Sequence, residues 1–341
     1  MSEPLHTPSI VAGRYDVHGV LSNSGGCGVI YKARDRFLRD RDVLIKARRY
    51  PPELFATHHD EARTETIERL RRETLFEWQM LVYFRETENE CRIPVVHDVV
   101  HDASVHLAGP HRDRDGAAFT LDDDFVRNEP YIVLQNIPGQ NLETYAEQER
   151  KHAHWESRVL VIALQLATIL SRFHRPNPAG QYFIYQDLKP ANVMISYDRF
   201  VTLIDFGGIT VVGPDPDDPQ GRLRSQWGEK GSPDEGSYGH AGLGTPGFKP
   251  PEMEFESAHL DGTADIYTLG ATMFALLTGQ EISRTQPEYG PIDSGALDGG
   301  GWREDLIELI RRALAPDPMQ RVPTMQGMRE ALAETLKSRR T

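Results

Sequence analysis

The stretch FIYQDLKPANVMI, residues 183–195, places Asp187, Lys189 and Asn192 in one short polar loop between apolar ends. A carboxylate can accept a proton, an ammonium group can balance negative charge, and an amide oxygen can bind a hard cation. Taken alone, Asp-Leu-Lys-Pro is equally typical of a polar surface turn. What this loop does therefore depends on which other groups the chain carries and in which order.

Composition limits the class of protein. The 341 residues, 39% hydrophobic and 26% charged, suit one or two globular domains. There is no apolar run of about 18 residues and no basic, apolar leader, so we expect a cytoplasmic protein. The net charge of −13 argues against a nucleic-acid partner. Cys27 and Cys91 cannot form a disulfide framework, and they lack the spacing of a zinc motif.

Apolar spacing predicts an α+β chain with a strand-rich first part and a helix-rich second part. Strands are expected within 14–50, around a glycine-rich turn, and at 92–100, 130–137 and 201–204. Helices are expected at 61–86, 156–174, 264–279, 303–315 and 324–340. Residues 101–129 read as an exposed insertion, and residues 213–244 hold too much Gly, Pro and Asp for a regular core.

A glycine-rich turn and a strand lysine in the first part point to phosphate binding. Gly25, Gly26 and Gly28 let backbone N–H groups approach phosphate oxygens without a Cβ in the way. Lys46 ends the apolar strand VLIK, where burying an ammonium group without a partner is costly. Phosphates together with a carboxylate would supply those partners.

The helix expected at 61–86 offers two carboxylates for Lys46. Glu73 and Glu77 lie one turn apart on the same face. We prefer Glu77 because apolar Leu81 follows it one turn later, whereas Glu73 has Glu77 in that place. Either glutamate could simply be solvated on the helix surface, so the choice between them stays open.

Asp205 follows the apolar strand at 201–204 directly and, with Asn192, offers the oxygen ligands that magnesium requires. Asp187 could then accept the proton of an incoming hydroxyl, and Lys189 could balance charge on a moving phosphoryl group. Phosphoryl transfer needs little more than such positioning. A glycine loop, a strand lysine, a helix glutamate, this polar loop and Asp-Phe-Gly are not expected in this order by chance.

In these motifs the chain resembles the eukaryotic-like, bacterial-type Ser/Thr protein kinases, roughly over residues 15–336. The matching stretches are NSGGCGVIY, VLIK, YIVLQNIPGQNL, YQDLKPAN, IDFGG, GTPGFKPPE, ADIYTLG and PDPMQR. The resemblance implies a two-lobed protein-kinase-like fold, with a small N-lobe of antiparallel sheet plus one long helix and a larger, mainly helical C-lobe. It divides the chain into an extension 1–13, an N-lobe 14–137 with an insertion at about 101–130, and a C-lobe 138–337 with a long activation segment 205–252.

The same resemblance assigns roles to individual residues. ATP would be bound by Asn23, Gly25, Gly26, Gly28, Ile30, Lys46, Leu134, Gln135 and Ile137. The catalytic residues would be Asp187, Lys189, Lys46 and Glu77, and Mg2+, for which Mn2+ can substitute, would be held by Asn192 and Asp205. Three further contacts are implied: Thr245 with Asp187 and Lys189, Glu252 with Arg321, and Asp265 with the backbone of the polar loop.

The implied function is an ATP-dependent protein serine/threonine kinase that transfers the γ-phosphoryl group to protein hydroxyls. Small-molecule kinases such as the aminoglycoside phosphotransferases lack the GTPGF…PPE segment and its Arg partner, so a protein substrate, not identified by the sequence, is expected. Self-association for autophosphorylation is a further expected partner relation. The alternatives are a pseudokinase or nucleotide-binding scaffold and, less favoured, a small-molecule kinase.

The departures from the family pattern affect residues implied in packing and regulation more than residues implied in catalysis. Asn23 replaces the first loop glycine, and Asn tolerates positive φ better than most residues. Tyr185 replaces a His that packs beneath the Asp-Phe-Gly motif, and Gln186 replaces an Arg that binds an activation-loop phosphate. Glutamine is neutral and cannot form that charge-assisted contact. We therefore predict that phosphorylation of the activation segment is not a strong switch. Residues 214–236 of that segment are either disordered or an inhibitory lid.

Overall fold

A computed structural model describes most of the chain in two compact units. The described residues are 10–22, 28–48, 61–88, 91–101, 129–214, 223–225, 245–254, 260–280 and 295–338. One unit comprises Met1–Asn89 and Ile93–Ile137, and the other comprises Glu90–Arg92 and Pro138–Thr341. Asn23, Gly25, Gly26, most of the expected insertion and much of the expected activation segment lie outside the described residues.

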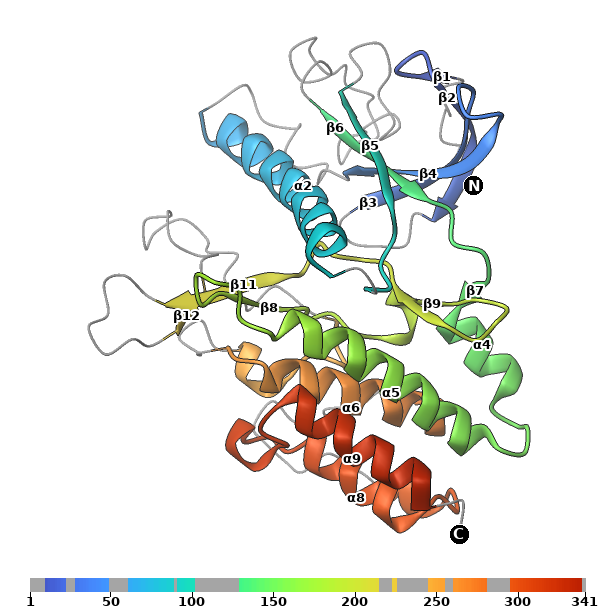
Figure 1. The fold of residues 1–341 in the computed structure, drawn as a ribbon, viewed down its shortest axis with the longest axis vertical. Coiled ribbons are helices and arrows are strands. Elements are labelled where there is room, and N and C mark those ends of the chain that lie inside the picture. The colour runs from blue at the N-terminus through green and yellow to red at the C-terminus, as the bar shows by residue number, and fades with distance from the viewer. Residues whose placement is uncertain are drawn as a thin grey trace, which may run out of the picture. The chain divides into compact units, whose positions relative to one another are not determined.

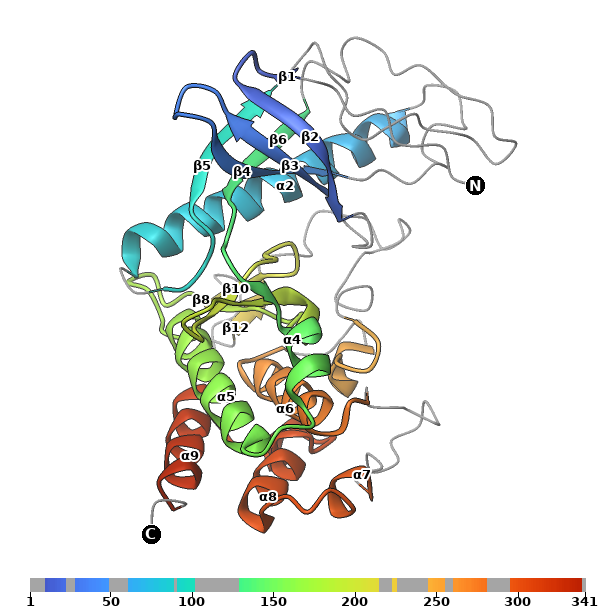
Figure 2. The same cartoon turned by 90° about the vertical axis from the view of Figure 1, so that its right-hand side faces the viewer.

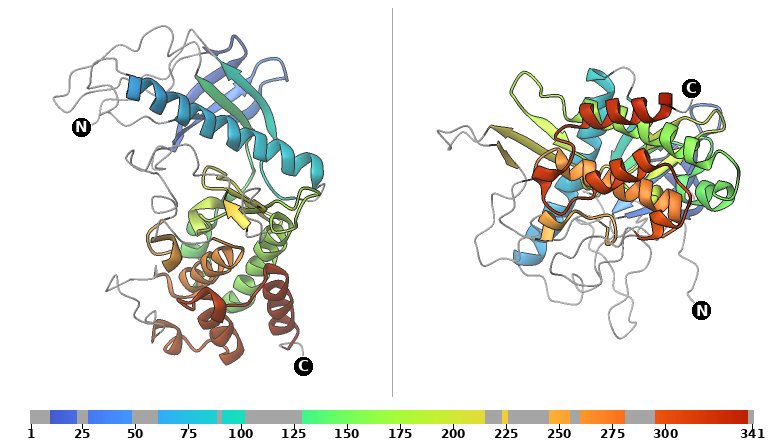
Figure 3. Two further views of the ribbon diagram at one scale, coloured as in Figure 1. Left: turned by 90° about the vertical axis from the view of Figure 1, so that its left-hand side faces the viewer. Right: turned by 90° about the horizontal axis from the view of Figure 1, so that it is seen from below.

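The first unit is an antiparallel sheet with one long helix. The six strands lie in the order β1-β2-β3-β4-β6-β5 (Figure 1). They are β1 Ile10–Val11, β2 Tyr15–Ser22, β3 Gly28–Asp35, β4 Arg41–Arg48, β5 Val96–His101 and β6 Pro130–Gln135. Helix α2, Glu61–Thr87, packs against β4, β5 and β6, and Figure 3 (left) shows the sheet from the side on which this helix lies.

Alternation along β4 divides the sheet into two faces. Val43, Ile45 and Ala47 are buried in one apolar cluster with residues of β1, β2, β3 and β6. Lys46 points to the opposite face, on which the register places Ile30 of β3 and Ile132 of β6 directly beside it. Because side chains alternate along β4, Lys46 lies on the helix-covered face of the sheet, whereas Val43, Ile45 and Ala47 form part of the core on the other face.

An ion network links the turn between β1 and β2 to strands β3 and β5 of the same sheet. Arg14 donates to both carboxylate oxygens of Asp35, at 2.9 and 2.6 Å, and to Asp98 at 3.2 Å. The Tyr15 hydroxyl donates to Asp98 at 3.0 Å. The hydrogen bonds from Arg14 hold the pKa of Asp35 below its ordinary value, and burial raises the pKa of Tyr15.

The second unit is mainly helical with two small sheets. Its helices are α4 Leu142–Glu149, α5 Trp155–Phe173, α6 Thr263–Thr278, α7 Gly295–Asp298, α8 Glu304–Ala313 and α9 Met325–Lys337. Its strands are β7 Gln140–Asn141, β8 Tyr182–Ile184, β9 Val193–Ile195, β10 Val201–Leu203, β11 Thr210–Pro214 and β12 Leu223–Ser225. Short 3-10 turns span Pro190–Asn192, Pro251–Glu254 and Pro318–Gln320. The strands pair in the orders β10-β9-β7 and β12-β11-β8.

Helix α6 is the centre of the second unit. Every residue from Thr263 to Leu277 is buried, and α5, α8 and α9 all contact α6. Figure 3 (right) and Figure 1 show these helices side by side. A helix that is buried all round requires such neighbours on every side. This arrangement confirms the predicted α+β class with a mainly helical second part.

Several local elements differ from the sequence expectation. Helix α4 was not expected, although Asn141 caps it by accepting a hydrogen bond from the N–H of Glu143 at 2.8 Å. Strand β12 and the end of β11, which pair with one another, reach into the stretch 213–244 that was expected to be irregular. The pairing extends a sheet begun by β8, so partners distant in sequence supply order that local composition does not. Among the described residues, none of the helices combines the length and apolar character needed to cross a membrane.

Candidate active site

The first unit holds a buried lysine–carboxylate pair. Lys46 Nζ donates to Glu77 Oε1 at 2.6 Å, and the two side chains are 11% and 5% exposed. Glu73, one turn earlier on α2, instead accepts from Arg48 at 2.6 Å and is 30% exposed. The structure thus places Glu77 against the lysine and gives Glu73 a different, more exposed partner.

The other described residues expected to bind nucleotide line the same face of the sheet or follow it. Ile30 and Lys46 are register partners, and Leu134 faces Leu44 two positions from Lys46. At Gly28 an added Cβ would lie 2.9 Å from the carbonyl oxygen of Ala47, so a side chain does not fit there without a shift. Gln135, the last residue of β6, and Ile137, two residues beyond it, are half-buried.

In the second unit, three side chains from the loop 185–192 and its surroundings meet at Asp187. Thr245 donates its hydroxyl to Asp187 Oδ1 at 2.7 Å. Lys189 donates to Asp187 Oδ2 at 2.9 Å and also contacts the Thr245 hydroxyl oxygen. Asn192 Nδ2 donates to Asp187 Oδ2 and to the Asp187 carbonyl, both at 2.8 Å. These three donors therefore hold the Asp187 carboxylate in one orientation, in a position to accept a proton.

Asp205 is held next to this network by the backbone. The N–H of Ile204 donates to the Asn192 carbonyl at 3.1 Å, which brings the start of Asp-Phe-Gly to the end of the loop. A Cβ added at Gly208 would lie 3.6 Å from the Cβ of Asp187, so the following turn lies beside that aspartate too. Because the Asn192 amide nitrogen donates to Asp187, the oxygen of the same amide is the atom that could bind a cation. An amide oxygen and the Asp205 carboxylate are donors that fit Mg2+.

Asp265 anchors the loop 185–192 from the buried helix α6. Its two carboxylate oxygens accept from the N–H groups of Tyr185 and Gln186, both at 2.8 Å, and Oδ2 also lies 2.8 Å from His174 Nε2. Thr272, two turns further along α6, donates to the Leu188 carbonyl at 3.2 Å. The most buried helix of the unit thus fixes the backbone on which the polar side chains stand.

The two unusual residues of the loop are both buried. The ring of Tyr185 packs edge-on against Phe206 at 5.6 Å between centroids and near Phe173 at 6.4 Å. It therefore supports Phe206 beneath Asp205, as expected for the residue in this place. Gln186, at φ +67°, donates its amide to the Thr210 hydroxyl at 2.6 Å.

A buried ion pair closes the segment that follows Thr245. Arg321 donates to both oxygens of Glu252, at 2.6 and 2.7 Å, and its side chain is 0% exposed. The same guanidinium donates to the carbonyls of Ala315, Thr263 and Pro316. The guanidinium therefore donates five hydrogen bonds, from Nε, Nη1 and Nη2. Contacts at Thr245 and at Glu252 attach residues 245–252 to the core of the unit at both ends.

Besides His174 and Thr272, two further residues that support the site were not anticipated. Thr210 is the buried partner of Gln186, and Asn141 donates its amide to the Ala191 carbonyl at 2.6 Å. A threonine at the start of a strand carries no local signal of such a contact. Asn141 did carry one, because an Asn before an Ala-, Leu- and Glu-rich run is a typical helix cap.

Comparison with known proteins places the chain in a family. Residues 93–333 match the protein kinase domain model, so the chain belongs to the protein kinase family. It is 26% identical to the serine/threonine-protein kinase PknG of Mycolicibacterium smegmatis, over 98% of this chain and 34% of that protein. Identity is 26% to serine/threonine-protein kinase F of Synechocystis, over 92% and 54%, and 24% to PknB of Mycobacterium tuberculosis, over 96% and 44%. These matches identify the chain as a member of the bacterial-type Ser/Thr protein kinases.

The fold has a solved counterpart. The kinase domain of PknI from Mycobacterium tuberculosis superposes with a TM-score of 0.56 at 18% identity, over 95% of this chain and 97% of that one. This likeness supports the kinase fold alone. The chain spans only about a third of the length of PknG and about half of the other two relatives.

Proposed function

We propose that this chain is an ATP-dependent protein serine/threonine kinase that transfers a phosphoryl group to protein hydroxyls. The observation that carries the proposal is the network at Asp187, in which Thr245, Lys189 and Asn192 all bond to one carboxylate. A pseudokinase needs no such organisation, because its function does not require a positioned base. The same network gives each polar side chain of the loop a partner and a fixed direction.

Each part has a defined role in this proposal. Lys46, held by Glu77, binds phosphate oxygens of ATP. Asp187 orients the acceptor hydroxyl and takes its proton, and Lys189 balances charge on the transferred group. Asn192 and Asp205 would hold Mg2+, which supplies a positive charge for the phosphates when bound.

A protein substrate is supported by the segment between Thr245 and Glu252. Thr245 contacts the proposed base, and Glu252 is bound to the buried Arg321, so the segment is held close to the reacting groups by contacts at both ends. An ordered segment beside the base can present a polypeptide hydroxyl, whereas a small molecule requires no such surface.

Transfer from labelled ATP tests the proposal. Wild-type protein with MgATP should label itself or a general protein substrate, whereas Asp187→Asn and Lys46→Met should not. The matched controls are Asp198→Asn and Lys32→Met, which change exposed residues of the same two types and should retain activity. A thermal shift with MgATP but no label in the wild type would refute transfer and favour a pseudokinase. Label on the Lys46→Met chain mixed with wild type would demonstrate transfer between copies.

We further propose that activity does not require a phosphate on the activation segment. The place of the family's phosphate-binding Arg is taken by Gln186, which is 1% exposed and bonded to Thr210 in β11. A neutral, internally bonded amide offers no cation to a phosphate, yet it links the loop 185–192 to the strand after Asp-Phe-Gly. Protein treated with phosphatase before the assay should keep its full rate. A large loss of rate on dephosphorylation would contradict this proposal.

A further inference from the structure

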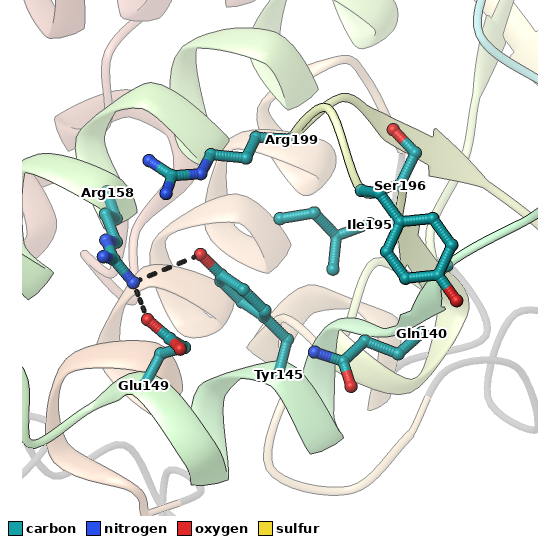
Figure 4. Close-up of a pocket in the computed structure, with 9 residues that line it drawn as sticks. Gln140, Tyr145, Glu149, Arg158, Ile195, Ser196 and Arg199 are labelled. Carbon is teal, nitrogen blue, oxygen red and sulfur yellow. Dashed lines mark hydrogen bonds and ion pairs between the residues drawn. The ribbon is translucent and has the colours of Figure 1, made fainter.

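A pocket in the second unit lies apart from the network at Asp187. It has a cavity volume of about 280 Å³ and lies between α4, the start of α5 and the turn joining β9 to β10. Figure 4 shows its polar side chains, and Figure 2 shows the unit from the side on which α4 lies. The volume is slightly below the range of roughly 300–1,000 Å³ usual for small-molecule sites, so the pocket suits one or two side chains of a peptide better than a nucleotide.

The charge of this pocket is unbalanced. Arg158 forms an ion pair with Glu149 and donates to the Tyr145 hydroxyl at 3.4 Å, so its charge is compensated. Arg199 lines the same pocket, and within the described part of the chain its guanidinium makes no hydrogen bond or ion pair. The lining therefore carries one uncompensated positive charge, which a single carboxylate would match better than a phosphate dianion.

The turn that carries Arg199 is held firmly. Arg199 lies at φ +66°, its N–H donates to the Ser196 carbonyl at 2.9 Å, and its own carbonyl accepts from Gln165 Nε2 at 3.1 Å. Two hydrogen bonds therefore fix the Arg199 backbone, while its side chain remains uncommitted. An arginine fixed at its base and free at its tip is suited to binding a ligand rather than to stabilising the fold.

Apolar surface adjoins the charge. Tyr197, which lines the pocket, is 88% exposed, whereas Phe200 in the same turn is 41% exposed with the Arg92 guanidinium over one face of its ring. Val161, one turn after Arg158 on α5, is 41% exposed. Exposed aromatic groups beside an arginine are the residue types that dominate protein-binding surfaces. An apolar side chain next to an acidic one would complement this surface.

We propose that this pocket binds an acidic peptide segment of a protein partner, with one Asp or Glu carboxylate on Arg199 and an apolar neighbour on Tyr197. The pocket is connected to the loop 185–192 through one hydrogen bond. Gln140, in the pocket lining, precedes Asn141, whose amide holds the Ala191 carbonyl between Lys189 and Asn192. The site would thus hold a partner at a fixed place relative to Asp187. Binding itself does not depend on the proposed transfer activity.

Fluorescence anisotropy of labelled short peptides on the full chain, without nucleotide, tests the site. The probes are degenerate pools with adjacent central residues fixed as Leu-Glu, Leu-Gln or Leu-phosphoserine. The Leu-Glu pool should bind about ten-fold more tightly than the Leu-Gln pool, the usual value of a charge-assisted hydrogen bond, and Arg199→Gln should abolish that difference. Added salt should weaken the Leu-Glu pool selectively.

The chain offers a matched control. Arg39 is also an exposed arginine at positive φ, in the turn between β3 and β4 of the first unit. Arg39→Gln should bind all pools as the wild type does, and circular dichroism should show both variants folded. Equal binding of the Leu-Glu pool by the Arg199→Gln and Arg39→Gln variants would overturn the proposal, as would equal binding of the Leu-Glu and Leu-Gln pools. Tighter binding of the phosphoserine pool through Arg199 would overturn the carboxylate assignment in favour of a phosphopeptide.

Discussion

Replacing Glu77 by glutamine, with Glu73→Gln as its matched control, tests whether the Lys46–Glu77 pair or the Arg48–Glu73 pair belongs to the candidate active site. Both glutamates bond to a cation of β4 at 2.6 Å. Glu77 is 5% exposed and Glu73 is 30% exposed. The two substitutions are chemically identical and lie one turn apart, so any difference between them reflects the partner and the burial.

The expected magnitudes follow from these environments. Glutamine keeps an acceptor oxygen for Lys46 but removes its charge, which exchanges a charge-assisted hydrogen bond for a neutral one. The free energy of unfolding should fall by about 1.5 kcal/mol for Glu77→Gln. At the more exposed Glu73 the loss should be about 0.5 kcal/mol, because solvent screens the pair.

The effect on transfer should separate the variants more widely. Without its carboxylate anchor, Lys46 is no longer held at one position, and a misplaced phosphate ligand lowers the rate by roughly 100-fold. Initial rates with labelled ATP and urea unfolding followed by circular dichroism measure both quantities on the same samples. If Glu73→Gln slowed transfer as much as Glu77→Gln, the assignment of Glu77 to the site would be refuted.

Three further outcomes are expected. Arg321→Met should lower the free energy of unfolding by about 4 kcal/mol in denaturant titrations, because the carboxylate of Glu252 loses its buried partner; a loss no larger than that of a surface pair would contradict this. Thr245→Val should reduce transfer but lower the free energy of unfolding by only about 1 kcal/mol, because it removes the hydroxyl that donates to Asp187 and accepts from Lys189 at a partly exposed site; unaltered rates would count against a role in positioning. Asp35→Asn should lower stability by about 2 kcal/mol near neutral pH, since the pKa of Asp35 is lowered by Arg14. That contribution is present above the unfolded-state pKa of about 4 and is lost as pH falls through the folded pKa, so wild type and variant should converge in acid melts.

Elements with a strong local pattern could be predicted from the sequence. The long helix expected at 61–86 is found at Glu61–Thr87, because its apolar spacing and its contacts arise from the same face. Strand β12 could not be predicted, since its order comes from pairing with β11, which in turn pairs with the distant β8. The glycine and proline content of a segment indicates only its local conformational preference, which pairing with a distant strand can override.

The residues of the candidate site also divide into those that a local sequence pattern predicts and those that only the fold brings together. Asp187, Lys189 and Asn192 are close in sequence, and spacing alone favoured Glu77 over Glu73. The contact of Gln186 with Thr210 joins residues with no common local pattern, and only the fold brings them together. The pocket at Arg199 could not be predicted either, because an exposed arginine in a turn gives no sign of a binding site unless its neighbours in the fold are known.

Asp265 has a consequence for how this loop can change over time. It accepts hydrogen bonds from the main-chain N–H groups of Tyr185 and Gln186 and makes no demand on their side chains. Every residue except proline supplies that donor. Substitutions at these two positions therefore leave this backbone anchor intact, so regulation can change during evolution while Asp187, Lys189 and Asn192 stay in place.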